Sequence, residues 1–529
     1  MRMKTLYYGG PIRTMETDAP AGALLVENGV IAAVGALEKL RARAGNAAEI
    51  DLEGRVLLPG FIDAHSHFSG AAYALLQAPL GEETDFAGIA QALTRFIADN
   101  RVPQGAWVVG KGYDQTALAE QRHPARALLD RVSASHPIMI VHQSGHMGVF
   151  NTRALELLGV TPDTLAPAGG AIGKEGGVLT GYMEENAFLY YQQQVPAPDL
   201  ADLLDACCRT QQMYASHGVT TVQEGMLPGS LFSLYRELLA RNMLELDVVA
   251  YPGVDALDTA CDVFPGSVRR YDHHFKLGGC KMFLDGSPQG RTAWMRTPYQ
   301  GTEDGYCGYG TMTDSALREA LLHAYRSGMQ PIAHCNGDAA AAQYLSAVAA
   351  IERAHPDFRD LRPVMIHAQL LDIDQMDKAE QLGIIPSFFI AHVYHWGDTH
   401  IRNFGLERAS RISAAHAALD RGIRFTFHQD TPVLPPDMLE TVWCAVCRLT
   451  KGGVTLGADQ RIPAEAALRA VTVNAAHQYF EEARRGSLRP GKAADLVLLD
   501  ADPLAVPPEK LRDIRVLETI KAGETVWRA

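Results

Sequence analysis

The sequence contains no apolar run of membrane-spanning length, since polar or charged residues interrupt every hydrophobic stretch. Its N-terminal segment lacks the apolar stretch of a secretory signal. Cysteine is scarce, with 8 residues in 529 and no regular spacing that would indicate a disulfide framework. We therefore expect a cytoplasmic protein that keeps its thiols reduced and has no membrane partner.

Positive charge is also in short supply. Lysine and arginine number 48 against 61 aspartate and glutamate residues, which gives a net charge of −13 without long runs of one sign. This balance argues against nucleic acid as a partner. Hydrophobic residues make up 47% of the chain, an ordinary share for a globular enzyme. With 529 residues, we expect at least two domains, or one large α/β barrel with an appendage.

Two short motifs could bind a metal ion. Cys444 and Cys447 form a CxxC pair, but no second pair completes a zinc site, so we interpret them as buried thiols. His65 and His67 stand one residue apart after the apolar segment 56–62. On a strand, alternate residues point to one face, so the two imidazoles would form half of a metal site. The pair alone is weak evidence, because many such pairs lie on surfaces or in cores.

From about residue 204 the chain alternates helix-length spacers with short apolar runs. Together with the segment that ends at His67, these runs give eight strand candidates, at residues 57–67, 218–222, 246–250, 281–284, 331–334, 363–367, 384–389 and 423–427. Alternating β and α units imply a parallel sheet, and eight of them predict a (β/α)8 TIM barrel. Residues 70–203 lack this rhythm and indicate an insertion after the first barrel strand.

Both ends of the chain are β-rich. Asn28-Gly29 lies between two apolar runs and predicts a hairpin, and residues 495–499 and 518–527 have strand-like patterns. We expect residues 1–58 and 480–529 to pair into a small β-sandwich domain. Residues 59–479 would form the barrel, with 70–203 as its insertion or cap.

Polar residues stand at the carboxyl ends of the barrel-strand candidates, where barrels of this type carry their active sites. They are His65, His67, Lys281, His334, His367 and Asp430. A single histidine at the end of an apolar strand is more often structural. Four that converge with a lysine and an aspartate favour a metal centre.

Lys281 lies inside an apolar strand, where a charged ammonium group is costly. It could form an ion pair with Asp285 or Asp430. Alternatively, Lys276 could be the functional lysine of this region. The sequence leaves these interpretations open.

Several segments together resemble the amidohydrolase superfamily and, within it, the amidohydrolase-3 (YtcJ-like) group. They follow the family's order over nearly the whole chain, at 58–67 (LPGFIDAHSH), 145–151 (GHMGVFN), 281–293 (KMFLDGSPQGRTA), 334–338 (HCNGD), 366–369 (IHAQ), 430–433 (DTPV) and 486–497 (GSLRPGKAADLV). The chain departs from the family's pattern at His428-Gln429, where small residues are usual, and at Ala339, where an arginine is usual. These departures concern the substrate rather than the metal ligands.

The resemblance implies a metal-dependent hydrolase with two divalent metal ions, most often Zn²⁺, at the mouth of the barrel. By the resemblance, the first ion would be bound by His65, His67 and Asp430, the second by His334 and His367, and both would be bridged by carboxylated Lys281. A bridging hydroxide would attack a carbonyl carbon, and Asp430 would act as general base and then as general acid. The reaction implied is cleavage of a C–N bond, as in an N-formyl or N-acyl amine.

Three residues are candidates for substrate binding. His146 lies in the insertion, within a Gly-His block that lines the site in the resembling family, although a plain loop histidine fits the pattern equally well. Arg291 and Trp294 lie in a Gly-rich loop that could cover the mouth, or Trp294 could be core packing. The aromatic segment 388–396 suggests a substrate with a hydrophobic or aromatic group, and two histidines within it compete as metal ligands.

Two other functions stay open on this evidence. A mononuclear deaminase of the same fold would bind one metal ion and leave Lys281 unmodified. A catalytically silent barrel would serve in regulation or binding. We expect a small-molecule substrate and, from the frequency of such assemblies among soluble enzymes, a homodimer.

Overall fold

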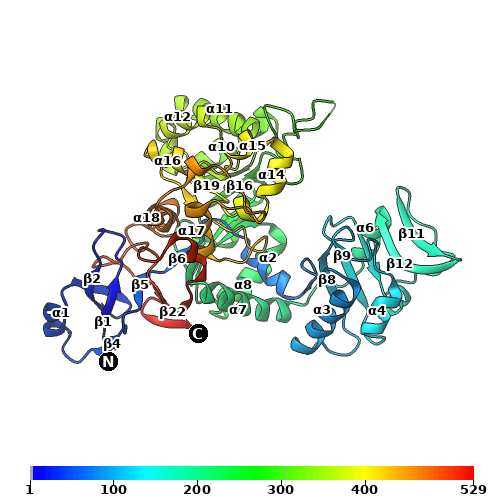
Figure 1. The fold of residues 1–529 in the computed structure, drawn as a ribbon, viewed down its shortest axis with the longest axis horizontal. Coiled ribbons are helices and arrows are strands. Elements are labelled where there is room, and N and C mark those ends of the chain that lie inside the picture. Colours follow the sequence, from blue (N-terminus) through cyan, green and yellow to red (C-terminus); the bar gives the residue numbers. More distant parts are fainter. Residues whose placement is uncertain (1–3, 303) are drawn as a thin grey trace. The chain divides into compact units, whose positions relative to one another are not determined.

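The computed structural model describes residues 4–302 and 304–529 (Figure 1). The chain divides into two compact units, one made of the residues up to Ser69 together with Cys208–Ala529, and the other of Gly70–Cys207. It passes from one unit to the other within α2 (Phe68–Leu75) and α7 (Leu200–Ser216). In the described part of the chain, every helix is too short or too polar to cross a lipid bilayer.

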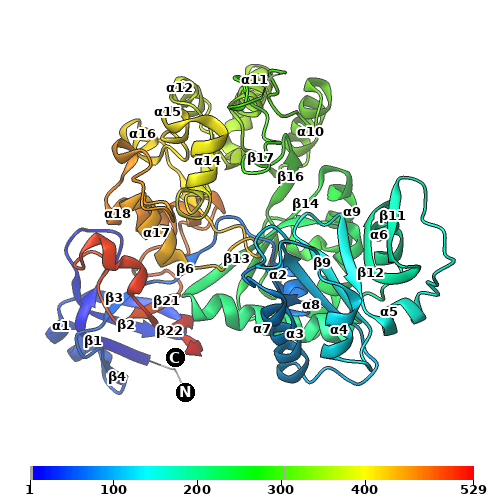
Figure 2. The ribbon, with the colours of Figure 1, turned by 45° about the vertical axis from the view of Figure 1, so that its right-hand side comes forward.

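Strands from both ends of the chain form one sheet in the first unit, and Figures 1 and 2 show the blue N-terminal strands beside the red C-terminal ones. Its order is β23-β22-β21-β5-β1-β2-β3, with β4 beside β1. The strands are β1 (Lys4–Ile12), β2 (Ala21–Glu27), β3 (Val30–Gly35), β4 (Ala48–Asp51), β5 (Val56–Pro59), β21 (Leu496–Leu499), β22 (Val516–Lys521) and β23 (Glu524–Arg528). All belong to a single hydrogen-bonded sheet, and the two-layered sandwich with its domain boundaries stays a prediction.

The predicted hairpin is confirmed, because β2 and β3 pair antiparallel around Asn28 and Gly29. Both turn residues have positive φ, 50° and 77°, which this tight connection requires. The period of two buries both faces of β2: Leu24 packs into one apolar cluster and Leu25 into another, which includes residues of α1 (Leu37–Ala44).

Each of the eight predicted barrel segments contains a strand, and these strands form two parallel sheets together with a ninth, β15, that the sequence pattern did not predict. One has the order β15-β14-β13-β6 and the other β16-β17-β18-β19-β20. Their bounds are β6 (Phe61–Ile62), β13 (Val219–Leu227), β14 (Asp247–Pro252), β15 (Phe275–Leu277), β16 (Gly279–Phe283), β17 (Gln330–Cys335), β18 (Val364–His367), β19 (Ile385–Phe388) and β20 (Thr426–Phe427). A parallel bridge between Gly253 and Lys281 joins the two sheets.

The predicted barrel is not closed by strand pairing, since within the described residues β20 and β6 belong to separate sheets. Both are only two residues long, and the backbone N–H of Ile62 in β6 donates to the carbonyl of Val471 at 2.9 Å. The segments that follow β6 and β20 do meet, because the N–H of His67 donates to the carbonyl of Thr431 at 2.8 Å. The fold is therefore α/β with parallel sheets whose carboxyl ends converge at this point.

Helices follow most of these strands. The longer ones are α8 (Phe232–Ala240), α9 (Leu257–Val263), α10 (Asp314–Arg326), α11 (Asp338–Ala354), α12 (Ile373–Gln381), α14 (Gly397–Phe404), α17 (Met438–Cys447) and α18 (Ala464–Ala470). The shorter ones are α13 (His392–His395), α15 (Leu406–Ala409), α16 (Ala415–Asp420) and α19 (Val473–Gln478). Cys444 and Cys447 lie buried in α17 as free thiols, as the sequence predicts.

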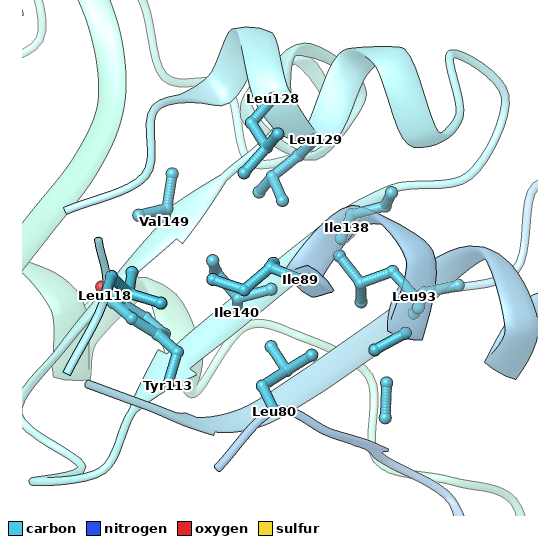
Figure 3. Close-up of a cluster of buried hydrophobic side chains, with 13 residues drawn as sticks. Leu80, Ile89, Leu93, Tyr113, Leu118, Leu128, Leu129, Ile138, Ile140 and Val149 are labelled. Carbon is cyan, nitrogen blue, oxygen red and sulfur yellow. The ribbon is translucent and has the colours of Figure 1, made fainter. Parts of the chain in front are cut away.

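The second unit has its own sheet, in the order β11-β12-β10-β9-β8-β7. Its elements are β7 (Ala78–Pro79), α3 (Phe86–Asp99), β8 (Val108–Tyr113), α4 (Arg126–Val132), β9 (Ile138–His142), β10 (Met147–Phe150), α5 (Thr152–Leu157), β11 (Gly170–Glu175), β12 (Val178–Glu185) and α6 (Asn186–Gln192). Figure 3 shows its core, where Ile89 and Leu93 of α3 and Leu129 of α4 point toward Ile140 of β9. This buried cluster makes residues 70–207 a compact unit in their own right.

Candidate metal centre

His65, His67 and Asp430 meet at the carboxyl ends of β6 and β20. The Nε2 atoms of the two histidines lie 3.4 and 3.3 Å from Oδ1 of Asp430. One ligand atom from each of the three residues lies within 4.8 Å of the others, so a single ion could contact all three. This group unites residues far apart in sequence, and the His67–Thr431 backbone hydrogen bond holds the two segments together.

Gln223 of β13 fixes which nitrogen of His65 faces this centre. The side-chain amide of Gln223 donates to the carbonyl of Ala64 at 2.9 Å and to the hydroxyl of Tyr479 at 3.0 Å. Its oxygen must therefore accept the 2.5 Å hydrogen bond from Nδ1 of His65. That bond leaves the lone pair of Nε2 directed at Asp430. Burial, followed by the charge of Lys281, lowers the pKa of His65 and favours the neutral ring that binds metals.

Lys281 lies beside the same histidine, with Nζ 3.3 Å from Nε2 of His65. Its side chain is buried, and burial lowers its pKa to about 7 although Asp430 raises it. The two ion pairs considered from the sequence do not form, because Asp285 and Asp430 both pair with histidines. Lys276 is occupied elsewhere, since its ammonium group donates to Glu481 at 2.5 Å.

His334 and His367 form the second part of the centre, with ring centroids 4.6 Å apart. Nε2 of His367 lies 4.0 Å from Oδ2 of Asp430. Its Nδ1 lies 3.1 Å from Nε2 of His428, whose Nδ1 is 2.9 Å from the hydroxyl of Ser387. Burial lowers the pKa of His367 and takes that of His428 to about 3, so both rings are neutral. The contact with His428 holds the ring of His367 with its Nε2 on the side of Asp430.

Asp285 holds the segments around His334. Its carboxylate accepts hydrogen bonds from the backbone N–H groups of Trp294 at 3.0 Å, Asn336 at 2.9 Å and Gly337 at 2.7 Å. Oδ1 also lies 3.3 Å from Nδ1 of His334. One buried carboxylate thus ties the ends of β16 and β17 to the loop that follows Lys281.

Two of the candidate ligands have a backbone conformation that is rare outside glycine. His367 has φ of 70° and Asp430 has φ of 54°. Left-handed conformations of such residues are costly and cluster at functional sites. Both side chains are directed at the shared centre by these turns at the strand ends.

The donor set fits a divalent metal ion. Oδ1 of Asp430 and Nδ1 of His334 are buried and have no hydrogen-bond partner among the described residues. Burial would raise the pKa of Asp430, but the neighbouring His67, together with His428 and Lys281, lowers it. Imidazoles and a carboxylate suit zinc and other first-row metals. The ionised oxygen that no donor satisfies is the atom a cation would bind.

The three residues predicted to bind substrate contact other parts of the chain. His146 belongs to the unit 70–207, where its exposed ring lies 3.2 Å from Glu185. Nε of Arg291 donates to Asn403 at 2.9 Å, and Trp294 is half-buried in the loop held by Asp285. Their part in substrate binding stays a prediction.

The two competing histidines of segment 388–396 have other partners. The ring of His392 lies 3.1 Å from Nε2 of His400, and His395 pairs with Glu440 at 3.1 Å. Phe389 does pack near the centre, since its ring centroid lies 6.2 Å from that of His367.

Sequence reasoning missed Gln223 and the contact of His428 with His367. A signal for Gln223 was available, because Gln223 and Glu224 follow the apolar run Val219–Val222 at the carboxyl end of a strand. Glu224 is buried there and accepts from the hydroxyl of Tyr235 at 2.6 Å and the N–H of Ser69 at 2.8 Å.

Comparison with known proteins agrees with this geometry. The YtcJ protein of Bacillus subtilis (strain 168), named as an amidohydrolase, is 27% identical over 548 residues that cover 99% of each chain. N-substituted formamide deformylase of Arthrobacter pascens is 28% identical over 540 residues, covering 97% of this chain and 96% of its own length. In fold, the chain resembles a metal-dependent hydrolase from Pyrococcus furiosus, with a TM-score of 0.77, 22% identity, and coverage of 95% of this chain and 100% of the other.

The family model described as "Amidohydrolase family" matches residues 48–527, nearly the whole chain. The match includes every residue of the centre described above, from His65 to Asp430. The chain therefore belongs to the amidohydrolase family.

Proposed function

We propose that this protein is a metal-dependent hydrolase that cleaves the C–N bond of an amide, such as an N-formyl or N-acyl amine. The observation that carries the proposal is the group of His65, His67 and Asp430 with the buried amine of Lys281 beside it. The name of the deformylase from Arthrobacter pascens supports an amide as the substrate class. The order of the parallel strands supports a (β/α)8 barrel as the scaffold.

The site would hold two divalent ions, most often Zn²⁺. His65, His67 and Asp430 would hold one, and His334 with His367 the other. Lys281, carboxylated on its amine, would contribute an anionic ligand to both, which accounts for a buried lysine that forms no ion pair with a carboxylate among the described residues. Bound ions would lower the pKa of a water molecule to about 7 and polarise the substrate carbonyl.

The residues of the chain would then move one proton. Asp430 accepts a proton from the attacking water while the oxygen forms a bond to the carbonyl carbon. As the C–N bond breaks, Asp430 returns that proton to the departing nitrogen, and the products are a carboxylic acid and an amine. Gln223 holds His65 in the tautomer that leaves Nε2 free, and His428 orients the ring of His367.

A mononuclear deaminase of the same fold is a second candidate. It is favoured by one observation: within the described residues, the only three-ligand group with such short separations is His65, His67 and Asp430. This enzyme would release ammonia from an amino-substituted ring rather than a substituted amine from an amide.

Hydrolysis of a panel of N-formyl and N-acyl amines, beside a panel of amino-substituted heterocycles, would test the proposal, with amine and ammonia measured separately. We expect amine release by the native chain, and a loss of about 10²–10⁴-fold in kcat for Asp430→Asn. Asp360→Asn, at an exposed position of the same unit, is the matched control and should keep the native rate. Ammonia release alone would favour the deaminase, and equal rates in both variants would remove Asp430 from the mechanism.

A further inference from the structure

A hollow of about 660 Å³ opens beside Lys281 in the first unit. Its apolar wall includes Met226, Val254, Phe283, Met312 and Ala316. These residues come from the carboxyl ends of β13, β14 and β16 and from the start of α10. The volume lies within the range of small-molecule sites, which are mostly apolar with a few polar groups.

Phe283 connects this hollow to the metal centre. It stands two residues after Lys281 on β16, so both side chains project from the same face of the strand. Its ring lies 5.1 Å from Nζ of Lys281, and its centroid is 5.4 Å from that of His334. Although it touches the centre on one side, Phe283 remains 39% exposed, which is unusual for a phenylalanine at the end of a buried strand.

The wall of the hollow is suited to flexible apolar groups. Unbranched methionine side chains adapt to irregular ligands, and Met226 and Met312 are only half-buried. Polar side chains, Asp255, Glu319 and His323, also line it. The loop segment at its edge is fixed, since the hydroxyl of Thr311 donates to the carbonyl of Phe283 at 2.7 Å and its N–H donates to the carbonyl of Leu284 at 2.9 Å.

We infer that this hollow binds the apolar substituent of the amide substrate and that its walls set the length of substituent the enzyme prefers. The inference rests on the proposed function and adds the substrate class: an amide with a flexible, aliphatic arm. A carbonyl group held at the metal centre would place such an arm along Phe283 and toward Met226 and Met312. Ala316 of α10, which is half-buried, marks the space the arm would fill.

Two substrate series test this inference and identify which side of the amide carries the arm. N-alkylformamides lengthen the amine side, and N-methylalkanamides lengthen the acyl side. For the side that enters the hollow, we expect kcat/KM of the native enzyme to rise about fourfold with each added methylene over the first few carbons. For the other series, we expect no such rise in kcat/KM.

Ala316→Phe would fill the hollow, and Ser315→Phe, at the exposed neighbouring position, is its matched control. We expect Ala316→Phe to lower the ratio of kcat/KM for hexyl over methyl substituents by about tenfold or more, while Ser315→Phe keeps the native ratio. Met312→Ala would enlarge the hollow and move the optimum to longer substituents. Melting temperatures of all variants would verify that they fold.

The outcomes separate this inference from the proposed function. If the native enzyme hydrolyses neither series, the proposed function and the inference fall together. If it hydrolyses amides but shows no dependence on substituent length, or if Ala316→Phe and Ser315→Phe give the same ratio, the inference alone is wrong and amide hydrolysis stands.

Discussion

At this centre, individual residues must keep the histidine rings neutral and correctly oriented. Gln223 accepts from Nδ1 of His65, and His428 occupies Nδ1 of His367. In His65 the hydrogen bond on Nδ1 directs the lone pair of Nε2 toward Asp430, and the contact with His428 places Nε2 of His367 on the same side. The site is thus oriented before any ion binds, because these contacts involve only groups of the chain.

Asp285 should matter for the centre although it is not among the ligands. We predict that Asp285→Asn lowers metal affinity by about 10–100-fold, because the amide would present a donor to backbone N–H groups that need an acceptor. Metal dissociation constants, measured by competition with a chelator, would verify this, with Asp360→Asn as the control. Unchanged affinity would mean that Asp285 serves only to hold the loop of Trp294.

The candidate ligands could be predicted from the sequence better than the residues around them. Histidines at the ends of apolar strands stand out in a linear pattern, so His65, His334 and His367 were predicted. The partners of these rings come from other strands, and pairing Gln223 with His65 requires the register between β13 and β6. His428 was noticed only as a departure from a family pattern, because nothing in its local sequence indicates the contact with His367.

At the level of secondary-structure elements, a buried ion cluster joins the terminal sheet to the parallel strands. Asp247 at the start of β14 contacts Lys521 of β22 at 2.5 Å and is also paired with Arg485. Lys521 in turn lies 2.9 Å from Asp495, next to β21. Burial would raise the pKa of Asp247, but Arg485 and Lys521 hold it well below its ordinary value near 3.8.

This cluster gives a prediction about acid stability. Because the folded-state pKa of Asp247 is depressed, its contribution is present above the unfolded value near 3.8 and is lost as the pH falls through the folded value. We predict that Asp247→Asn destabilises the first unit by about 3–5 kcal/mol at neutral pH. Its melting temperature should then fall less steeply than that of the native chain between pH 5 and pH 3, a range set by that unfolded value.

Calorimetric melting across this pH range is the measurement, with Asp360→Asn as the surface control. Parallel declines for the native chain and Asp247→Asn would contradict the assignment, since the acid-labile stability would then lie in other carboxylates.

The strands themselves were predictable, whereas their closure was not. Eight apolar runs at helix-length spacing marked every strand of the two parallel sheets except β15, and β and α units in alternation indicated parallel pairing. Ile62 of β6 donates its N–H to the carbonyl of Val471 rather than to β20, and Val471 lies more than 400 residues along the chain. No local pattern carries such a long-range contact.

For the whole molecule, membership of the amidohydrolase family and the described geometry lead to the same residues. The family model spans residues 48–527. Within that range, candidate ligand atoms of His65, His67 and Asp430 lie within 4.8 Å of one another. They belong to the unit that is assembled from both ends of the chain. Length and composition predicted more than one compact unit, but not that residues 70–207 would have a separate sheet and core. Two strands in that segment, β11 and β12, lie in a glycine-rich stretch, and glycine weakens the pattern by which a strand is recognised.

The central claim is a metal centre in which Lys281 takes part, and metal content per chain tests it most directly. Elemental analysis of the native chain, Lys281→Ala and the exposed control Lys378→Ala would be paired with hydrolysis of N-formyl amines. We predict about two divalent ions in the native chain and in Lys378→Ala, and a loss of both metal and hydrolysis in Lys281→Ala. One ion in all three chains, with hydrolysis surviving in Lys281→Ala, would contradict the claim and leave the lysine a structural residue.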